Sequence, residues 1–179
     1  MIVVSDTTPL ITLMKAAKLD LLRNLFGEVL IPEAVYEEVT TNDNFKDESD
    51  LIKSSNYIKK VVVSRPDHVL RLQRATGLDR GESEAIVYAN ETKAEIILMD
   101  ELAGRRVARD MNLTITGSIG ILLQAFRYGL ISYEETKRTL NVILKANRHI
   151  SERLIRDALE ITEHIKSNMN ASKESEQKQ

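Results

Sequence analysis

The sequence predicts an α/β protein, a three-layer α/β/α sandwich with a central parallel sheet, followed by C-terminal helices. Short apolar runs have the length and the aliphatic composition of buried strands, at residues 2–5, 29–31, 61–63, 95–99 and 113–116. Helical patterns separate these runs, and alternating strands and helices indicate a parallel sheet with helices on both faces. From Gly117 onward the pattern is helical throughout.

Helices of the α/β part are expected where apolar residues recur at helical spacing between punctuating residues. The strand at 2–5 leads into a helix with Pro9 in its first turn, and Gly27 ends the next helix. The expected helices cover residues 7–14, 19–26, 32–40, 67–75, 81–92 and 101–111. Residues 41–56 are polar and lack a clear period, so we expect a mobile loop there with about one helical turn.

The C-terminal part is expected to form helices and a polar tail. Ser132 and Glu135 form a capping box ahead of an apolar stripe, and Ser151 can cap a last helix. The expected organisation is a core domain at 1–130, a helical extension at 131–167 packed on the core or a partner, and a disordered tail at 168–179.

Composition limits the classes of function. The 179 residues suffice for one domain with a sizeable core, and 42 % apolar with 29 % charged residues is ordinary for a globular protein. The absence of cysteine excludes disulfides and thiolate zinc sites. No apolar run approaches a membrane span and the chain begins directly with a strand, so we expect a cytoplasmic protein without membrane attachment. A net charge of −2 neither demands nor forbids a nucleic-acid partner.

Two of the apolar runs stop at an aspartate, Asp6 and Asp100. Ligands of open α/β sheets bind outside the carboxyl ends of the strands, so both carboxylates are expected at the ligand-binding edge. Like charges at close range repel, and a bound cation would remove that cost. Each aspartate alone can also be explained as the N-cap of the helix that follows it.

A glutamate on the helix at 81–92 is a candidate third acid. Glu82 lies on the same stripe as Ala85, Ile86 and Ala89, whereas Glu84 is about 200° away around the helix and should point outward. A carboxylate on a buried stripe needs a partner or a metal. Alternatively, Glu82 only favours the helix N-terminus electrostatically.

Weaker signals come from two other segments. In the helix from Pro32, Glu38 flanks the inward line of valines and Glu37 lies on the far side, although a lone glutamate is more often a solvated surface residue. The last strand ends in Thr116-Gly117-Ser118, whose hydroxyl and N–H groups could orient a water, a carboxylate or a phosphate, or could form a simple turn and cap.

Arginines surround the expected acidic site in the sequence. Arg105, Arg106 and Arg109 follow Asp100, and three further arginines, Arg71, Arg74 and Arg80, precede Glu82. Both groups could hold phosphates, and each alone could equally be part of a solvated helix. Aromatic residues are only 4 %, so extensive base stacking is not expected.

Five segments of the chain resemble the PIN-domain family of ribonucleases, the fold of VapC-type toxins. These segments are Val-Val-Ser-Asp6-Thr-Thr-Pro-Leu-Ile, Ile-Pro-Glu-Ala-Val-Tyr-Glu-Glu38-Val, Leu-Asp-Arg-Gly-Glu82-Ser-Glu-Ala-Ile, Ile-Leu-Met-Asp100-Glu and Leu-Thr-Ile-Thr116-Gly. Their order and spacing fit over about residues 1–130. The segments around Glu82 and at Thr116-Gly117-Ser118-Ile-Gly120 look like a subgroup described only as predicted nucleic-acid-binding proteins.

The resemblance implies a Mg²⁺- or Mn²⁺-dependent endoribonuclease. It assigns the catalytic acids to Asp6, Glu38, Glu82 and Asp100, with metal ligands at Asp6, Glu82 and Asp100. We expect RNA contacts from Thr7, Thr116, Ser118, Arg105 and Arg106. Clustered carboxylate oxygens suit Mg²⁺ or Mn²⁺, which would activate water for phosphodiester hydrolysis.

The chain departs from the family pattern at two positions. Many members have Asp where this chain has Glu82, and many carry a further acid shortly after the fourth, where this chain has Glu101 followed by Leu102, Ala103 and Gly104. Toxin members are usually paired with a small antitoxin whose segment fills the active-site groove. A small antitoxin and a second copy of the chain, forming a homodimer, are therefore candidate partners besides RNA.

Three functions remain open from the sequence. The first is a metal-dependent ribonuclease, including the toxin of a toxin–antitoxin pair. The second is a non-catalytic RNA- or protein-binding module that retains the fold, favoured by the incomplete acid set and the long C-terminal helices. The third is a small-molecule phosphatase that uses the same metals.

Overall fold

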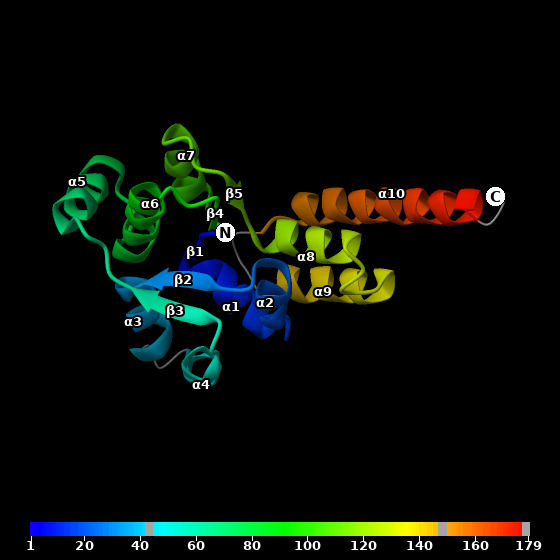
Figure 1. Cartoon of the computed structure of the whole chain (residues 1–179), viewed down its shortest axis with the longest axis horizontal. Helices are drawn as coiled ribbons and strands as arrows, with labels where there is room; N and C mark the ends of the chain where they lie inside the picture. Colours follow the sequence, from blue (N-terminus) through cyan, green and yellow to red (C-terminus); the bar gives the residue numbers. More distant parts are fainter. Residues whose placement is uncertain (42–44, 147–149, 177–179) are drawn as a thin grey trace.

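The computed structural model of the chain describes residues 1–41, 45–146 and 150–176. Its centre is a five-stranded sheet in the order β3-β2-β1-β4-β5, and all four strand pairs are parallel. The strands are β1 (Val3–Ser5), β2 (Val29–Pro32), β3 (Ile58–Val61), β4 (Ile96–Leu98) and β5 (Ile115–Thr116). The expected parallel α/β architecture is confirmed, and Figure 1 shows the helices around this sheet.

Ten helices are described. They are α1 (Thr7–Lys15), α2 (Asp20–Phe26), α3 (Glu33–Thr41), α4 (Lys46–Ser54), α5 (Pro66–Thr76), α6 (Arg80–Thr92), α7 (Leu102–Asp110), α8 (Ser118–Arg127), α9 (Tyr133–Ala146) and α10 (Glu152–Glu176). Most of them begin and end within a few residues of the positions that periodicity and capping predict. None of the helices in the described part of the chain has both the length and the apolar character needed to span a membrane.

Alternating strand residues supply two separate cores, one on each face of the sheet. Val3 and Leu98 are fully buried in the core formed with α1, α2, α3 and α8. Val4, Ile97 and Met99 are buried in the core formed with α6 and α7. Because successive side chains of a strand point to opposite faces, short apolar strands bury both sides and create the three-layer sandwich.

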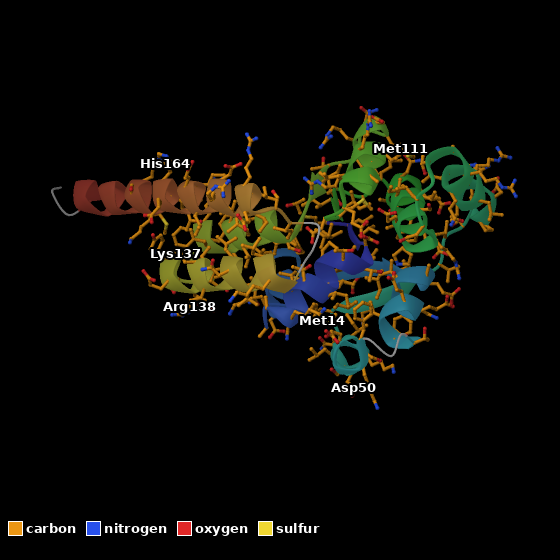
Figure 2. The ribbon with its side chains drawn as sticks, turned by 180° about the vertical axis from the view of Figure 1, so that it is seen from behind. Met14, Asp50, Met111, Lys137, Arg138 and His164 are labelled. Atoms are coloured by element: carbon orange, nitrogen blue, oxygen red, sulfur yellow. The ribbon has the colours of Figure 1, made fainter. Side chains whose placement is uncertain are left out.

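Helices α8, α9 and α10 lie side by side and extend away from the sheet, and the described chain ends at the far end of α10 (Figure 1). Lys137, Arg138 and His164 are carried by this helical arm (Figure 2). The inner stripe of α10 is buried, with Ile155, Ala158 and Thr162 between 0 % and 3 % exposed. The arm therefore packs as a layer of helices and connects to the α/β part through α1, α2 and β5.

Two expectations on elements are wrong. The segment 41–56, expected to be a loop, contains α4, which packs against α3 through buried Ser49 and Ile52. The third strand covers Ile58–Val61 instead of 61–63, and Val62 is 65 % exposed. Helix α10 runs to Glu176, and residues 177–179 lie outside the described part of the chain, so the disordered tail expected at 168–179 stays a prediction.

The reason for the shifted strand is its position at the edge of the sheet. An edge strand needs burial on only part of its surface, so Lys59 and Lys60 are exposed within it while Ile58 is 7 % exposed. Charged residues on an edge strand also hinder pairing with another chain. Of the valine run that was expected to be the strand, Val61 therefore ends β3, and Val62 and Val63 follow it outside the sheet.

Candidate active site

Asp6 and Asp100 follow two neighbouring strands, as the sequence predicts. In the pairing of β1 with β4, Ser5 lies opposite Leu98, and the Asp6 N–H donates to the Leu98 carbonyl at 3.0 Å. Both aspartates therefore lie beyond the carboxyl ends of central strands. This edge of an open parallel sheet is where ligands of such folds bind.

The carboxyl group of Asp6 is buried among other acids, and the residue is only 3 % exposed. Burial raises the pKa of Asp6 well above its usual value, and the negative charges of Asp79, Glu82 and Glu38 raise it further. A hydrogen bond from the Thr7 N–H lowers the pKa and opposes these effects. The position therefore favours either a proton or a cation at this carboxyl group.

Glu38, on α3, lies close enough to Asp6 for its charge to act on the Asp6 carboxyl group. The Thr7 hydroxyl donates to Glu38 Oε2 at 2.7 Å, and this contact links the first turn of α1 to α3. Partial burial raises the pKa of Glu38, the Thr7 hydrogen bond lowers it, and the charges of Asp79 and Glu101 raise it. The expectation that Glu38 turns toward the site agrees with this geometry.

Asp79 and Glu82 enter the site through the start of α6. They form a capping box, in which the Glu82 N–H donates to Asp79 Oδ1 at 2.8 Å and the Asp79 N–H donates to Glu82 Oε2 at 3.2 Å. A side chain at Gly81 would lie 3.4 Å from Glu38 Oε2 and 3.5 Å from Asp79 Oδ1. We call Asp6, Glu38, Asp79 and Glu82 the acidic cluster.

Glu82 points across to α7. It is 6 % exposed, and its Oε1 lies 2.8 Å from the position that a Cβ of Gly104 would take. The missing side chain at Gly104 thus leaves the space that this carboxylate occupies. Glu82 belongs to the capping box of α6 and also lies on the buried face of that helix. Its role at the helix N-terminus and its position in the candidate site are therefore compatible.

Asp100 is held by the turn between β5 and α8. The Ser118 N–H donates to Asp100 Oδ1 at 2.7 Å, and the Ser118 hydroxyl donates to Asp100 Oδ2 at 2.6 Å. Nearby, the Thr8 hydroxyl donates to Glu101 Oε1 at 3.1 Å. The expected Thr116-Gly117-Ser118 segment therefore orients a carboxylate, which is one of the roles that the sequence left open.

Arg105 lies beside Asp100 and donates from Nη1 to the Met99 carbonyl at 2.8 Å. Burial lowers the pKa of Arg105, the Asp100 charge raises it, and the charge of Arg109 lowers it. A Cβ at Gly117 would lie 2.5 Å from Asp100 Oδ1 and 3.1 Å from Arg105 Nη1. The close approach of these two side chains thus depends on a residue without a side chain at Gly117.

A groove of about 440 Å³ opens beside Asp100, between α7, β5, α8 and α10. Arg105, Arg109 and Thr116 line it with apolar residues of α8 and α10. Arg106, one of the expected RNA contacts, is exposed on α7 and does not line this groove, whereas Arg109 does. The basic side chains that line the groove with Asp100 are therefore Arg105 and Arg109, which lie one helical turn apart on α7.

One expectation about orientation is wrong. Glu84 does not point outward: it is 8 % exposed, accepts from the Ala34 N–H at 2.9 Å and accepts from Arg80 Nε at 2.7 Å. Contact between α6 and α3 buries this second face of α6, which a single inward stripe does not reveal. Glu37 lies on the exposed side of α3, as expected, and pairs with Arg80 at 3.1 Å.

Asp79 is a site residue that the sequence reasoning missed. The signal was present, because an aspartate three residues before a glutamate at a helix start is a capping-box pattern. Recognising that box would have placed the Asp79 carboxylate next to Glu82. It would not have shown Asp79 close to Asp6 and Glu38, which requires the tertiary fold.

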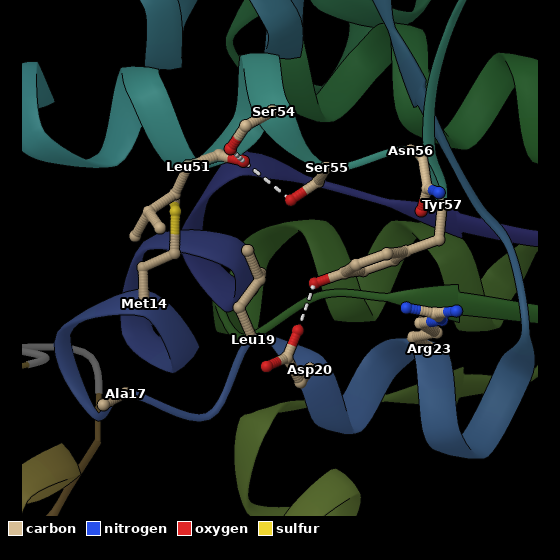
Figure 3. A pocket seen from close by; sticks show the side chains of 10 residues that line it. All are labelled: Met14, Ala17, Leu19, Asp20, Arg23, Leu51, Ser54, Ser55, Asn56 and Tyr57. Atoms are coloured by element: carbon tan, nitrogen blue, oxygen red, sulfur yellow. Dashed lines mark hydrogen bonds between the residues drawn. The ribbon is translucent and has the colours of Figure 1, made fainter.

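Another pocket, of about 580 Å³, is lined by none of these acids. Figure 3 shows the side chains that line it. It is bounded by the end of α1, the start of α2 and the segment before β3, and the Tyr57 hydroxyl is 3.2 Å from Asp20 Oδ1. Tyr57 precedes β3 and so marks the amino ends of the strands, whereas the acidic cluster follows their carboxyl ends. This pocket is not part of the candidate active site.

The donor atoms of the acidic cluster suit a hard divalent cation, because carboxylate oxygens are the ligands that Mg²⁺ and Mn²⁺ prefer. The buried, like-charged surroundings of Asp6 also favour a cation. Within residues 1–41, 45–146 and 150–176, no three His, Asp or Glu side chains are already arranged closely enough to hold one ion. The cluster therefore fits a metal by its chemistry and its charge, and its side chains would have to converge further to bind one.

Comparison with known protein families gives a match over most of the chain. The model of a family described as a PIN domain matches residues 2–164, which include the acidic cluster, Asp100 and most of the helical arm. No curated protein and no solved structure matches the chain.

Proposed function

Because this chain belongs to the PIN-domain family, whose members are generally nucleases that use divalent metals, we propose that it is a Mg²⁺- or Mn²⁺-dependent endoribonuclease. The observation that carries the proposal is the burial of Asp6 among Glu38, Asp79 and Glu82 at the carboxyl end of β1. A buried carboxyl group surrounded by like charges is costly for the fold and is typical of a functional site.

Asp6, Glu82 and Asp100 would hold the metal. When bound, Mg²⁺ or Mn²⁺ would polarise the phosphodiester and lower the pKa of a water molecule at the reacting phosphorus. Hydrogen bonds within the site orient Glu38 and two of these ligands. Thr7 fixes Glu38 at 2.7 Å, the capping box fixes Glu82, and Ser118 fixes both oxygens of Asp100.

The arginines beside Asp100 would bind the RNA backbone. Arg105 is anchored on the Met99 carbonyl and lines the groove together with Arg109. Guanidinium groups bind phosphate oxygens in a fixed geometry, so they would hold the strand in register without reading its sequence. Thr7, Thr116 and Ser118 are proposed substrate contacts at the same edge, and Arg106 is a proposed contact farther out on α7.

RNA cleavage by variants of the two strand-end aspartates tests this proposal. We expect Asp6→Asn and Asp100→Asn to lower Mn²⁺-dependent RNA cleavage by at least about 100-fold while the circular dichroism spectrum stays unchanged. Asp110→Asn is the matched control, because it removes an exposed acid at the end of α7. Cleavage at the original rate in both site variants would refute the nuclease proposal.

A second candidate function is a non-catalytic RNA- or protein-binding module with the PIN fold. It is favoured by the fact that the described side chains do not form a ready group of three metal-binding acids, and by the two hydrogen bonds that already engage Asp100. It predicts RNA or partner binding without metal-dependent turnover. Hydrolysis of a phosphomonoester but not of RNA would instead favour a phosphatase.

A toxin role, a small antitoxin partner and a homodimer are finer proposals within the same family. A toxin predicts growth arrest on expression that Asp6→Asn abolishes. Light scattering of the purified chain measures the dimer directly.

A further inference from the structure

A pocket of about 370 Å³ lies in the outer layer, between α5, α6 and the end of α7. Its floor is apolar and consists of Leu72, Ala75, Val87 and Met111. Figure 2 labels Met111, which directly follows α7. Aliphatic side chains and a polarizable thioether provide a surface on which a flat, weakly polar group can lie.

The rim of this pocket is polar and carries the cationic Arg71 together with His68 and Asn90. Asp67 is the carboxylate near these side chains, and its distances to Arg65, His68 and Arg71 are 4.0, 3.9 and 3.7 Å. One acid is thus shared between three basic side chains. The Arg71 side chain is 78 % exposed, so redirecting it toward an anion costs little.

Basic residues continue along α5 beyond the pocket. Arg65, His68, Arg71 and Arg74 follow one another at a spacing of three residues, about 4.5 Å along the helix axis. Each such step also turns the side chain by about 60° around the helix, so Arg65 and Arg74 lie on opposite sides of α5, whereas Arg71 and Arg74 lie on adjacent faces. Two neighbouring guanidinium groups suit two successive phosphates of a chain.

We propose that the α5–α6–α7 pocket binds one nucleotide of a single-stranded RNA, with the base on the apolar floor and the neighbouring phosphates on Arg71 and Arg74. Asn90 offers an amide that can both donate to and accept from a base edge. An apolar slot, a cationic rim and an amide match the three parts of a nucleotide. An acidic peptide would use the cations, but its carboxylate side chains have no group that suits the apolar floor.

The distance between this pocket and the acidic cluster determines which nucleotide of a bound RNA the pocket would hold. Glu82 lies in the first turn of α6 and Asn90 in its last, and eight residues of helix span about 12 Å. That distance corresponds to about three to four stacked nucleotides at 3.4 Å each. The pocket would therefore hold a nucleotide at about this distance from the cleaved bond. Only this distance to the cleaved bond rests on the proposed nuclease function. RNA binding in the pocket does not rest on it.

The test measures RNA binding without cleavage. Fluorescence anisotropy with an end-labelled single-stranded RNA of about 12 nucleotides, in EDTA, reports affinity independently of turnover. Arg71→Glu removes the central cation, and Ala75→Phe fills the exposed floor position. Arg156→Glu is the matched control, because Arg156 is also exposed (66 %) and pairs with an acid one turn earlier, Glu152, at 3.8 Å.

We expect Arg71→Glu and Ala75→Phe each to weaken binding about tenfold, and Arg71→Glu to reduce the salt dependence by about one phosphate contact. Arg156→Glu should bind as the original chain does.

Unchanged affinity of both pocket variants for the longer RNA would overturn the proposal, and so would equal losses in the Arg156→Glu control. Loss of binding in the pocket variants of a chain that never cleaves RNA would support this proposal and contradict the nuclease. Metal-dependent cleavage of RNA, together with an RNA affinity that does not depend on Arg71, would support the nuclease and contradict the pocket proposal. The two proposals therefore fail separately.

Discussion

At the scale of single residues, Asp6 carries an electrostatic cost that the fold must bear. Its carboxyl group is buried, and three other acids raise its pKa after burial itself has done so. Folding therefore favours the neutral carboxyl group over the charged one. A residue that lowers stability and lies at the ligand-binding edge is typical of a site selected for function.

Replacing Asp6 should therefore stabilise the protein without metal. We expect Asp6→Asn to raise the free energy of unfolding by about 1–3 kcal/mol at neutral pH in EDTA, because it removes a buried charge and keeps the acceptor for the Thr7 N–H. Urea denaturation of both proteins measures this difference. A destabilised Asp6→Asn variant would show that the carboxylate is favourably paired.

The pH dependence of that difference follows from the raised pKa. The stabilisation by a protonated Asp6 is fully present below the unfolded pKa of about 4 and is lost as pH rises through the folded pKa. The gain from Asp6→Asn should thus be near zero in acid and should grow toward neutral pH. The same denaturation series, repeated across pH, measures this trend.

Gly117 allows a second close contact in the site. Its φ of −128° suits any residue, so the demand for glycine comes from space and not from backbone strain. A Cβ there would lie 2.5 Å from Asp100 Oδ1 and 3.1 Å from the Met99 carbonyl oxygen. We expect Gly117→Ala to destabilise the fold by about 1–3 kcal/mol and to displace Asp100 from Ser118.

Gly81→Ala is the control for that substitution. Its Cβ would meet its nearest neighbour, Glu38 Oε2, at 3.4 Å, which is ordinary contact, and alanine is the better helix former. Thermal denaturation of the two variants should show a loss for Gly117→Ala alone. Equal melting temperatures would mean that Asp100 is not held in the arrangement described.

At the scale of elements, Glu84 connects two helices that flank the acidic cluster. It accepts a hydrogen bond from the Ala34 N–H, near the start of α3, and another from Arg80 Nε on its own helix. The first turn of a helix has N–H groups without partners inside the helix. Glu84 therefore fixes the position from which α3 presents Glu38.

Removing this connection should be costly. We expect Glu84→Ala to lower the free energy of unfolding by about 1–3 kcal/mol, because the buried Ala34 N–H loses its acceptor. Glu37→Ala removes the exposed partner of Arg80 and should change stability by less than about 0.5 kcal/mol. Urea denaturation compares them, and similar losses would contradict the distinct role of Glu84.

Strands buried on both faces and helices with a regular apolar stripe could be predicted from the sequence, whereas α4 and the bounds of β3 could not. The strands at β1, β2 and β4 were expected correctly because their aliphatic runs are nearly continuous. Helix α4 was not expected, since it buries only a narrow face around Ile52 and is otherwise polar. The tertiary contact with α3 stabilises it, and no local pattern reports such a contact.

The candidate site shows the same division between local and tertiary information. Asp6, Glu82 and Asp100 could be selected because each has a position on a strand end or a helix stripe. The Asp79 carboxylate and the burial of Glu84 depend on α3 lying against α6. Pairwise distances between acids from distant segments are properties of the fold and cannot be read from one sequence.

At the scale of the whole molecule, the helical arm is continuous with the core. Ile155 belongs to the same apolar core as Leu10 and Leu13 of α1, and it is 3 % exposed. The boundary proposed near residue 130 therefore separates layers that share a core. The match of the family model to residues 2–164 also includes most of the arm.

Cooperative unfolding of the arm with the α/β part follows from that shared core. We expect Ile155→Ala to lower the stability of the whole chain by about 2–4 kcal/mol in a single transition. Leu154→Ala, at a neighbouring position that is 43 % exposed, should cost less than about 1 kcal/mol. Two separate transitions on heating would show that the extension folds as an independent unit.

The central claim is that acids from β1, α6 and the end of β4 share one divalent ion. Isothermal titration calorimetry of the chain with Mn²⁺ measures the binding of this ion most directly. Asp110→Asn is the control for the loss of a surface charge. We predict one saturable site, weakened at least about tenfold by Asp6→Asn and by Glu82→Gln and unaffected by Asp110→Asn. Equal Mn²⁺ affinity in all four proteins, or no saturable binding in any of them, would contradict it.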